Sequence, residues 1–326
     1  MSSDGRSPLV TVIGEALIDL VPAGSDRTFV AHPGGSPFNV AVGLARLGTR
    51  TALMARLGDC AFGAILRRQA RDEGIDLSAA PLAREATSLA VVSFDAEARA
   101  SYDFYFDGTA DWNWSAPEVD RVPAGTTVLH FGSVASWRAP GDVQITRMVE
   151  AVRQGGEALV SYDPNIRPLL LRDPAHGRAM VERSVGLAHV VKASSEDVGW
   201  LYPGHTLDTV GRRWLNLGVR LVVFTDGASG AVAVAASGAT AVRPGLAVDL
   251  SDTVGAGDSF TSALIDSLVR LGVASPTSLD TIAESDLAAV VEDAVVASAL
   301  TCERPGADPP TAVEVATARR RFRVSR

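Results

Sequence analysis

The chain has 326 residues, of which 47% are hydrophobic and 21% are charged, and this is enough to bury the core of one large domain or two modest ones. Its 30 basic and 38 acidic side chains leave a net charge of −8, so the composition gives no reason to expect a nucleic-acid partner. Two cysteines without a CxxC spacing, and acidic residues that interrupt the best apolar stretches, predict a cytoplasmic protein with reduced thiols and no membrane-spanning segment.

Apolar runs typical of buried strands alternate with helical patterns along the chain. The strands are predicted at residues 9–13, 51–57, 128–131, 158–162, 189–192 and 221–224. Parallel strands need crossover helices of the kind predicted between them, so we expect an α/β fold, an αβα sandwich with a mainly parallel sheet. Residues 88–94 and 101–106 alternate polar and apolar side chains around a turn at 95–97, which predicts a β-hairpin.

A glycine pair near the N-terminus precedes one of the predicted helices. Ser36 and Pro37 are predicted as the N-cap and the first residue of that helix. The helix does not need Gly34 and Gly35 to begin, so a ligand that rests on their backbone explains them better. Asn39 lies in the first turn, where its amide reaches such a ligand.

A second glycine motif lies far along the chain. Gly255, Ala256 and Gly257 stand directly before Asp258, and an apolar helical pattern begins at Phe260. Glycines let the backbone turn tightly, and amides at the start of a helix form an anion site. Asp258 is therefore predicted as the base that takes the proton of a phosphoryl acceptor, while the amides before it stabilise the transferred phosphate. The alternative is an ordinary glycine-rich loop in which Asp258 only caps the helix.

The basic side chains limit how phosphate can be bound. Lys192 is the only lysine, and the chain contains no GxxxxGK sequence. A P-loop kinase is therefore excluded, and phosphate must be bound by backbone amides, arginine or a metal ion. The five histidines are scattered without metal-ligand spacing, so no histidine is assigned a catalytic role.

The two glycine motifs together resemble the paired signatures of the PfkB, or ribokinase-like, family of carbohydrate kinases, over nearly the whole chain. The resemblance implies one ribokinase-like domain over residues 1–326, an αβα sandwich with a small β-sheet lid from roughly residues 20–33 and 88–110. It also implies that Asp258 is the catalytic base beside an anion site at Gly255, Ala256 and Gly257. The implied sugar-binding residues are the aspartate of GE-x-x-x-D and members of the first motif: Asp19, Gly34, Gly35 and Asn39.

Two further segments match the family. The DPN-x-R sequence at 163–167 resembles the fructokinase branch and implies that Arg167 clamps phosphate or hydroxyl groups of the substrates. Ser194 and Asp197 match the register of the family's NxxE motif. They imply nucleotide binding by Ser194 and a water-mediated contact from Asp197 to Mg²⁺, with Glu196 as the alternative ligand.

Other segments imply contacts with the nucleotide and with a cation. Thr225 and Gly227 resemble the family's T-x-G nucleotide segment, and the nucleotide phosphates would also approach Gly257. The backbone carbonyls of Asp252 and Val254 resemble a monovalent-cation site. The expected cofactors are thus ATP, Mg²⁺ and K⁺.

The motifs together predict ATP-dependent phosphorylation of the primary hydroxyl of a sugar, with fructose as the first candidate. A 2-keto-3-deoxygluconate kinase is the alternative within this class, and it would need a further cation in the lid, where Arg99 is the only arginine of the hairpin. A catalytically silent sugar-binding regulator is the alternative from another class, but the intact run from Gly255 to Asp258 argues against it. The expected partners are the sugar, ATP and a second copy of the chain, bound through the lid.

Overall fold

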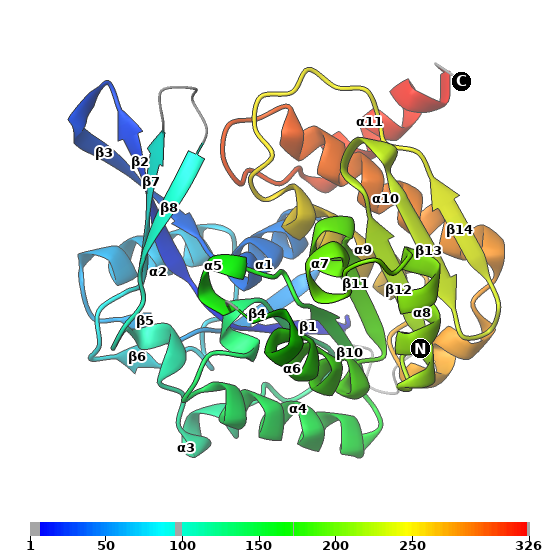
Figure 1. The fold of residues 1–326 in the computed structure, drawn as a ribbon, viewed down its shortest axis with the longest axis horizontal. Coiled ribbons are helices and arrows are strands. Elements are labelled where there is room, and N and C mark those ends of the chain that lie inside the picture. Colours follow the sequence, from blue (N-terminus) through cyan, green and yellow to red (C-terminus); the bar gives the residue numbers. More distant parts are fainter. Residues whose placement is uncertain (1–6, 95–99, 172, 325–326) are drawn as a thin grey trace.

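The computed structural model describes residues 7–94, 100–171 and 173–324, and an eight-stranded sheet forms their centre. The strand order is β14-β13-β12-β11-β10-β9-β1-β4 (Figure 1). The parallel strands are β1 (Leu9–Ile13), β4 (Arg50–Met54), β9 (Thr126–Gly132), β10 (Leu159–Asp163), β11 (Val190–Ser194) and β12 (Leu221–Thr225). Antiparallel strands β13 (Ala231–Ala235) and β14 (Thr240–Arg243) complete one edge. The predicted mainly parallel sheet is confirmed.

Helices cover both faces of this sheet, as the αβα prediction requires (Figure 1). One layer contains α1 (Ser36–Arg46), α9 (Ala256–Arg270) and α10 (Glu284–Cys302), and α11 (Ala312–Val324) packs on α10. The other layer contains α4 (Asp142–Gly155), α6 (Pro174–Leu187) and α8 (Leu207–Asn216). Alternate side chains of each strand point to opposite faces. Leu221 and Val223 of β12 therefore join one hydrophobic core, while Val222 and Phe224 join the other.

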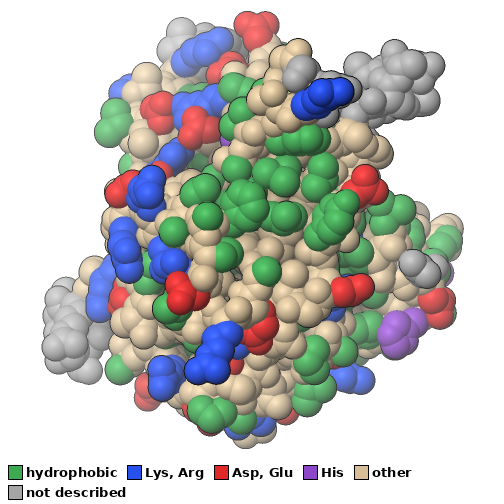
Figure 2. Space-filling model, turned by 90° about the vertical axis from the view of Figure 1, so that its left-hand side faces the viewer, with side chains coloured by type: hydrophobic (Ala, Val, Ile, Leu, Met, Phe, Trp, Pro, Cys, Tyr) green, Lys and Arg blue, Asp and Glu red, His purple; other side chains and the backbone are tan. Residues whose placement is uncertain are grey.

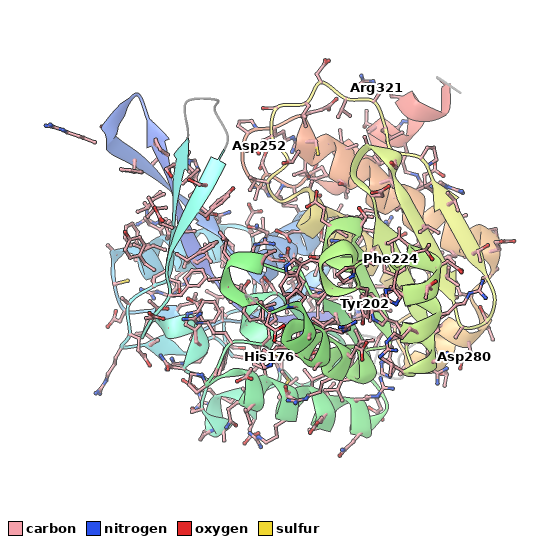
Figure 3. All side chains as sticks on the ribbon, viewed as in Figure 1. His176, Tyr202, Phe224, Asp252, Asp280 and Arg321 are labelled. Atoms are coloured by element: carbon pink, nitrogen blue, oxygen red, sulfur yellow. The ribbon has the colours of Figure 1, made fainter. Side chains whose placement is uncertain are left out.

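Large aromatic side chains fill the second core. Phe224 and Tyr202, which are labelled in Figure 3, both belong to this core and are buried. The indole of Trp214 donates to the Tyr202 hydroxyl at 2.9 Å, so its buried polar atom has a partner.

None of the described helices combines the length and the apolar character needed to cross a bilayer.

A second, smaller sheet stands beside the central one, in the order β3-β2-β7-β8 (Figure 1). It consists of β2 (Leu17–Ala23), β3 (Ser25–Gly34), β7 (Leu89–Phe94) and β8 (Ala100–Tyr105). The predicted hairpin is confirmed, because β7 and β8 pair antiparallel, while its predicted turn at 95–97 lies outside the described residues. Asp19 of β2 stands opposite Ala90 of β7, which in turn stands opposite Phe104 of β8. Residues opposite one another share a face, so the three side chains point to the same side.

Two local predictions were wrong. The strand expected at 51–57 ends at Met54, and Leu57–Gly58 forms a separate short strand, β5, that pairs with β6 (Leu82–Ala83). Between them, the Arg56 guanidinium donates to Glu118 at 3.2 Å and to Glu85 at 3.1 Å, and the chain there is not part of the central sheet. Ser36 is not the N-cap of α1. That position belongs to Gly35, at a φ of 99°, and the Ser36 hydroxyl bonds elsewhere.

Candidate active site

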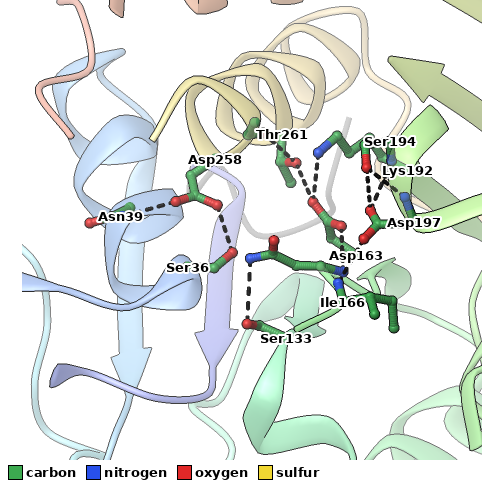
Figure 4. Close-up of polar contacts among 12 residues, drawn as sticks. Ser36, Asn39, Ser133, Asp163, Ile166, Lys192, Ser194, Asp197, Asp258 and Thr261 are labelled. Atoms are coloured by element: carbon green, nitrogen blue, oxygen red, sulfur yellow. Dashed lines mark hydrogen bonds and ion pairs between the residues drawn. The ribbon is translucent and has the colours of Figure 1, made fainter. Parts of the chain in front are cut away.

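The carboxylate of Asp258 lies between two helices that meet at the end of the central sheet. Asp258 is in the first turn of α9, and α1 supplies both of its partners (Figure 4). The Ser36 hydroxyl donates to one carboxylate oxygen at 2.6 Å, and the Asn39 side-chain amide donates to the other at 2.9 Å. Burial raises the pKa of Asp258, and the two donors oppose this shift by stabilising the charged form. The arrangement gives an oriented carboxylate whose proton affinity is above the ordinary value.

The turn before Asp258 depends on glycine. Gly255 is the N-cap of α9 and has a φ of 74°, in the left-handed region that favours glycine. A Cβ at this position would lie 2.6 Å from the Cβ of Ala307, so the neighbouring loop also excludes a side chain. Gly257 is exposed, and Ala256 is partly exposed. The first amides of α9 are thus accessible at the positive end of a helix of 15 residues, where an anion is stabilised.

Asp19 approaches the same region from the small sheet. A Cβ on Gly34 would collide with the Asp19 carboxylate, so the absent side chain at Gly34 makes room for this acid. Burial raises the pKa of Asp19 to about 6, nearby Arg167 lowers it, and Asp258 raises it further. Asp19, Arg167 and Asp258 are therefore near enough to influence one another electrostatically.

The DPN-x-R segment forms a tight loop at the end of β10. Asn165 has a φ of 40°, a conformation that asparagine tolerates better than most residues, and its N–H donates to Asp163 at 3.1 Å. The Asn165 side chain lies 3.4 Å from the Ser133 hydroxyl. Arg167 donates to the Asn165 side-chain oxygen at 2.7 Å, so its guanidinium is partly oriented before any substrate binds.

Ser194 and Asp197 fix the position of this loop. They form a capping box at the start of α7 (Ser195–Leu201), in which the Asp197 carboxylate accepts from the Ser194 N–H at 3.0 Å and from its hydroxyl at 2.8 Å. The other Asp197 oxygen accepts from the Ile166 N–H at 2.7 Å. Asp197 is buried, and Glu196 is exposed. The observed contacts of Asp197 are therefore with the protein backbone and Ser194.

The predicted nucleotide residues lie along the neighbouring strand. Ser194 at the end of β11 pairs in register with Thr225 at the end of β12. Gly227 follows at a φ of 47°, and a Cβ added there would meet open space. Thr225 and Gly227 thus continue the line of strand ends away from Asp258, on the side of the sheet where α/β folds bind ligands.

The described residues contain no group of three or more His, Cys, Asp or Glu side chains suited to hold a metal ion. Mg²⁺ is commonly held by one or two carboxylates together with substrate phosphates and water, so this donor set fits an ion that enters with the nucleotide.

Asp252 organises the loop of the predicted monovalent-cation site. Its two carboxylate oxygens accept from the N–H groups of Val254 at 3.0 Å and Gly306 at 2.9 Å. These bonds hold two loops together.

The structure adds three charged residues that the sequence did not assign to the site. Lys192 is buried and its Nζ lies 3.0 Å from a carboxylate oxygen of Asp163. A lysine within a buried strand was the available signal. Glu15 and Asp111 are buried under the junction of β1 and β2, and burial raises their pKa values to about 7 and about 6. Each accepts a backbone hydrogen bond, Glu15 from Ala135 at 3.0 Å and Asp111 from Ala16 at 2.8 Å.

Comparison with known proteins places this geometry in a family. The family model described as pfkB family carbohydrate kinase matches residues 7–313. A fructokinase-1 from Oryza sativa subsp. japonica is 33% identical over 323 residues, which cover 95% of this chain and 97% of the relative. Fructokinase with bound ATP from Xylella fastidiosa has a TM-score of 0.88 at 24% identity and covers 96% of this chain and 98% of that chain. A fructokinase double mutant from Vibrio cholerae, in a form bound to fructose, ADP and potassium ion, has a TM-score of 0.82 at 29% identity, over 95% of this chain and 99% of that chain.

Proposed function

Because this chain belongs to the pfkB family of carbohydrate kinases, we propose that it transfers the γ-phosphoryl group of ATP to the primary hydroxyl of fructose. The observation that carries the proposal is the double hydrogen bond from Ser36 and Asn39 to Asp258, next to the glycine turn of α9. This arrangement holds a base beside an anion site, which is what phosphoryl transfer to an alcohol requires.

Asp258 acts as the general base. The sugar hydroxyl loses its proton to the carboxylate as its oxygen forms a bond to the γ-phosphorus, and the bond from that phosphorus to the β–γ bridging oxygen breaks to leave ADP. The raised pKa of Asp258 favours acceptance of the proton, and the donors on α1 keep the carboxylate aimed at the acceptor. The amides of Gly255, Ala256 and Gly257 stabilise the charge that develops on the transferred phosphate.

The sugar binds between the small sheet and α1. Asp19 accepts hydrogen bonds from two sugar hydroxyls, Asn39 donates from the first turn of α1, and the backbone of Gly34 and Gly35 forms the surface beneath the sugar. Arg167 lies near Asp19 and faces the junction between the sugar and the phosphates, where its planar guanidinium binds hydroxyl or phosphate oxygens.

The nucleotide extends along the ends of β11 and β12. Ser194, Thr225, Gly227 and Gly257 contact it, with Gly227 allowing close backbone approach. Mg²⁺ would be held mainly by the phosphates of ATP and would supply positive charge that favours transfer of the phosphoryl group. Asp197, whose two oxygens accept hydrogen bonds from Ser194 and Ile166, would contact this ion through water.

A monovalent cation completes the set of cofactors. The carbonyls of Asp252 and Val254 would hold K⁺ on the loop that precedes the anion site, and the potassium ion bound by the Vibrio cholerae fructokinase supports this choice. The contacts of the Asp252 side chain keep that loop in place.

A neutral sugar is favoured over 2-keto-3-deoxygluconate. The sequences of β2, β7 and β8 contain no lysine or arginine, and β3 contains one arginine, Arg27, which is exposed. A sugar carboxylate would therefore depend on Arg27 or on Arg167, whose guanidinium is assigned to hydroxyl or phosphate oxygens. Arg99 lies outside the described residues. A silent regulator is disfavoured, because a protein that only binds sugar has no use for a base hydrogen-bonded at both oxygens.

The small sheet serves as a lid over the sugar and as the contact surface of a homodimer within a single-domain protomer. Phe29, Val30 and Tyr105 on this sheet are 42%, 45% and 61% exposed. Figure 2, which faces this side of the molecule, shows hydrophobic side chains gathered there. Exposed apolar groups of this kind mark contact surfaces.

Cys60 and Cys302 are free thiols, which supports a cytoplasmic location.

The experiment is an ADP-release assay with fructose, 2-keto-3-deoxygluconate, ribose and adenosine as acceptors. Fructose should give the highest kcat/KM, and ADP release should require the acceptor. Preference for another acceptor would overturn the assignment of fructose, and absence of turnover with all four would favour the regulator.

A further inference from the structure

A buried charge cluster lies directly beneath the glycine turn that precedes Asp258. The Nζ of Lys192, on β11, lies 3.0 Å from a carboxylate oxygen of Asp163 at the end of β10 (Figure 4). The hydroxyl of Thr261, one turn into α9, lies 3.2 Å from the same oxygen. The side chains of Lys192 and Asp163 are 6% and 3% exposed, so bulk water screens this pair very little.

The cluster is in contact with the anion site. A Cβ added at Gly257 would lie 3.1 Å from the Lys192 Nζ, so the ammonium group is directly below this residue of the turn. Thr261 also lies within hydrogen-bonding distance, 3.0 Å, of the Gly257 carbonyl. Lys192 and Thr261 therefore both contact Asp163, Thr261 also contacts the Gly257 carbonyl, and the Lys192 ammonium group occupies the space beside Gly257.

The surrounding charges keep Lys192 protonated. Burial alone would lower its pKa, but Asp163, Asp197 and Asp258 outweigh burial and raise it. In return, Lys192 opposes the increase in the pKa of Asp258. A fixed positive charge thus lies close to both the proposed base and the proposed phosphate site.

We propose that Lys192, held in place by Asp163, is a positioning residue for phosphoryl transfer that supplies positive charge beneath Gly257 and orients the glycine turn toward the γ-phosphate. The inference rests on the proposed kinase function. Fold stability alone is a poor reason for such a pair, since a buried ion pair commonly stabilises a fold no more than apolar residues of similar size. The positive charge of Lys192 is useful at a site that must bind the phosphates of ATP, because the chain contains no P-loop lysine to neutralise them.

The test compares Lys192→Met with the double variant Lys192→Met/Asp163→Asn. The single variant leaves the Asp163 carboxylate buried without its partner and is expected to be less stable. The double variant removes both charges, and its asparagine still accepts from the Asn165 N–H, so folding should recover. If the pair only stabilises the fold, kcat should recover as well. A role at the anion site predicts instead that kcat stays at least about tenfold below wild type, with the fructose KM changed less than about threefold.

A second readout does not depend on the sugar. Calorimetry should measure the affinities for ADP and for a non-hydrolysable ATP analogue, whose ratio isolates the γ-phosphate. The folded double variant should lose at least about tenfold in affinity for the analogue and much less for ADP. The control is Glu182→Gln/Arg213→Met, which removes an ion pair of 2.6 Å between α6 and α8 and should change neither kcat nor this ratio.

Wild-type kcat together with a wild-type affinity ratio in the folded double variant would overturn the positioning role. Failure of the wild-type protein to phosphorylate fructose would contradict the proposed substrate, while the affinity ratio would still test Lys192.

Discussion

Replacement of Asp258 by asparagine should abolish turnover and leave the site otherwise assembled. The asparagine side chain has nearly the same shape, and both of its hydrogen bonds can survive. Its oxygen can accept from the Asn39 amide, which now donates at 2.9 Å, and its amide can donate to the Ser36 oxygen, which now lies at 2.6 Å. The fructose KM should therefore change less than about threefold, because the groups around the sugar stay in place.

The lost function is proton acceptance. A positioned base contributes about 10²- to 10⁴-fold to the rate, so kcat should fall by at least about 100-fold. The assay is steady-state ADP release at saturating ATP and fructose, with thermal unfolding as the check on folding. Asp266→Asn is the matched control on the same helix. This buried aspartate accepts from Thr49 at 2.6 Å and pairs with Arg270 at 2.8 Å, so its loss should lower stability and leave kcat within about threefold of wild type. An Asp258→Asn variant that keeps a third or more of wild-type kcat at neutral pH would refute the assignment of the base.

Three further predictions concern the sugar site and its support. Asp19→Ala should raise the fructose KM about 10- to 100-fold without a matching change in the ATP KM, because it removes a charged acceptor from the sugar end alone; equal changes in both constants would indicate collapse of the site. Burial raises the pKa of Glu15 from its ordinary value of 4.5 to about 7. The protonated carboxyl therefore adds to the free energy of unfolding below pH 4.5, and this addition is lost as pH rises through 7. This loss amounts to about 3 kcal/mol. The free energy of unfolding of Glu15→Gln, measured with urea at several pH values, should lack this part of the pH dependence. The same change of unfolding free energy with pH in variant and wild type would contradict the raised pKa of Glu15. Amide exchange in the hairpin of β7 and β8 should slow when fructose saturates the protein, whereas unchanged exchange with normal turnover would rule out closure of the lid by the sugar.

The sequence was sufficient for the parts of the fold and site that depend on local pattern. The alternation of apolar strands with helices predicted the parallel sheet, and the glycines before Asp258 predicted a turn at the start of a helix. Gly255 has the positive φ that the motif suggests. These features follow from backbone conformation and hydrophobic period, which neighbouring residues largely determine.

Contacts between distant segments were not predictable in the same way. The N-cap preference of serine favoured Ser36 as the cap of α1. In the fold, however, the Ser36 hydroxyl donates to Asp258, which lies 222 residues further along the chain. The sequence alone identifies Lys192 only as the sole lysine of the chain. Its role depends on Asp163 in the neighbouring strand and on Gly257 in α9, and only the folded chain brings these together. The end of β4 could not be predicted, because it depends on the ion pairs of Arg56 with Glu85 and Glu118, which lie on two other segments.

The identity of the product tests the central claim most directly. The protein should be incubated with ATP, Mg²⁺, K⁺ and fructose, and the phosphorylated sugar examined by phosphorus and carbon NMR. The account predicts one product, with phosphate on a primary carbon of fructose, formed in equal amount to ADP and absent from the Asp258→Asn sample. Release of inorganic phosphate without a sugar phosphate, or phosphate on a secondary hydroxyl, would contradict a site in which Asp258 activates the primary hydroxyl against the anion-binding turn.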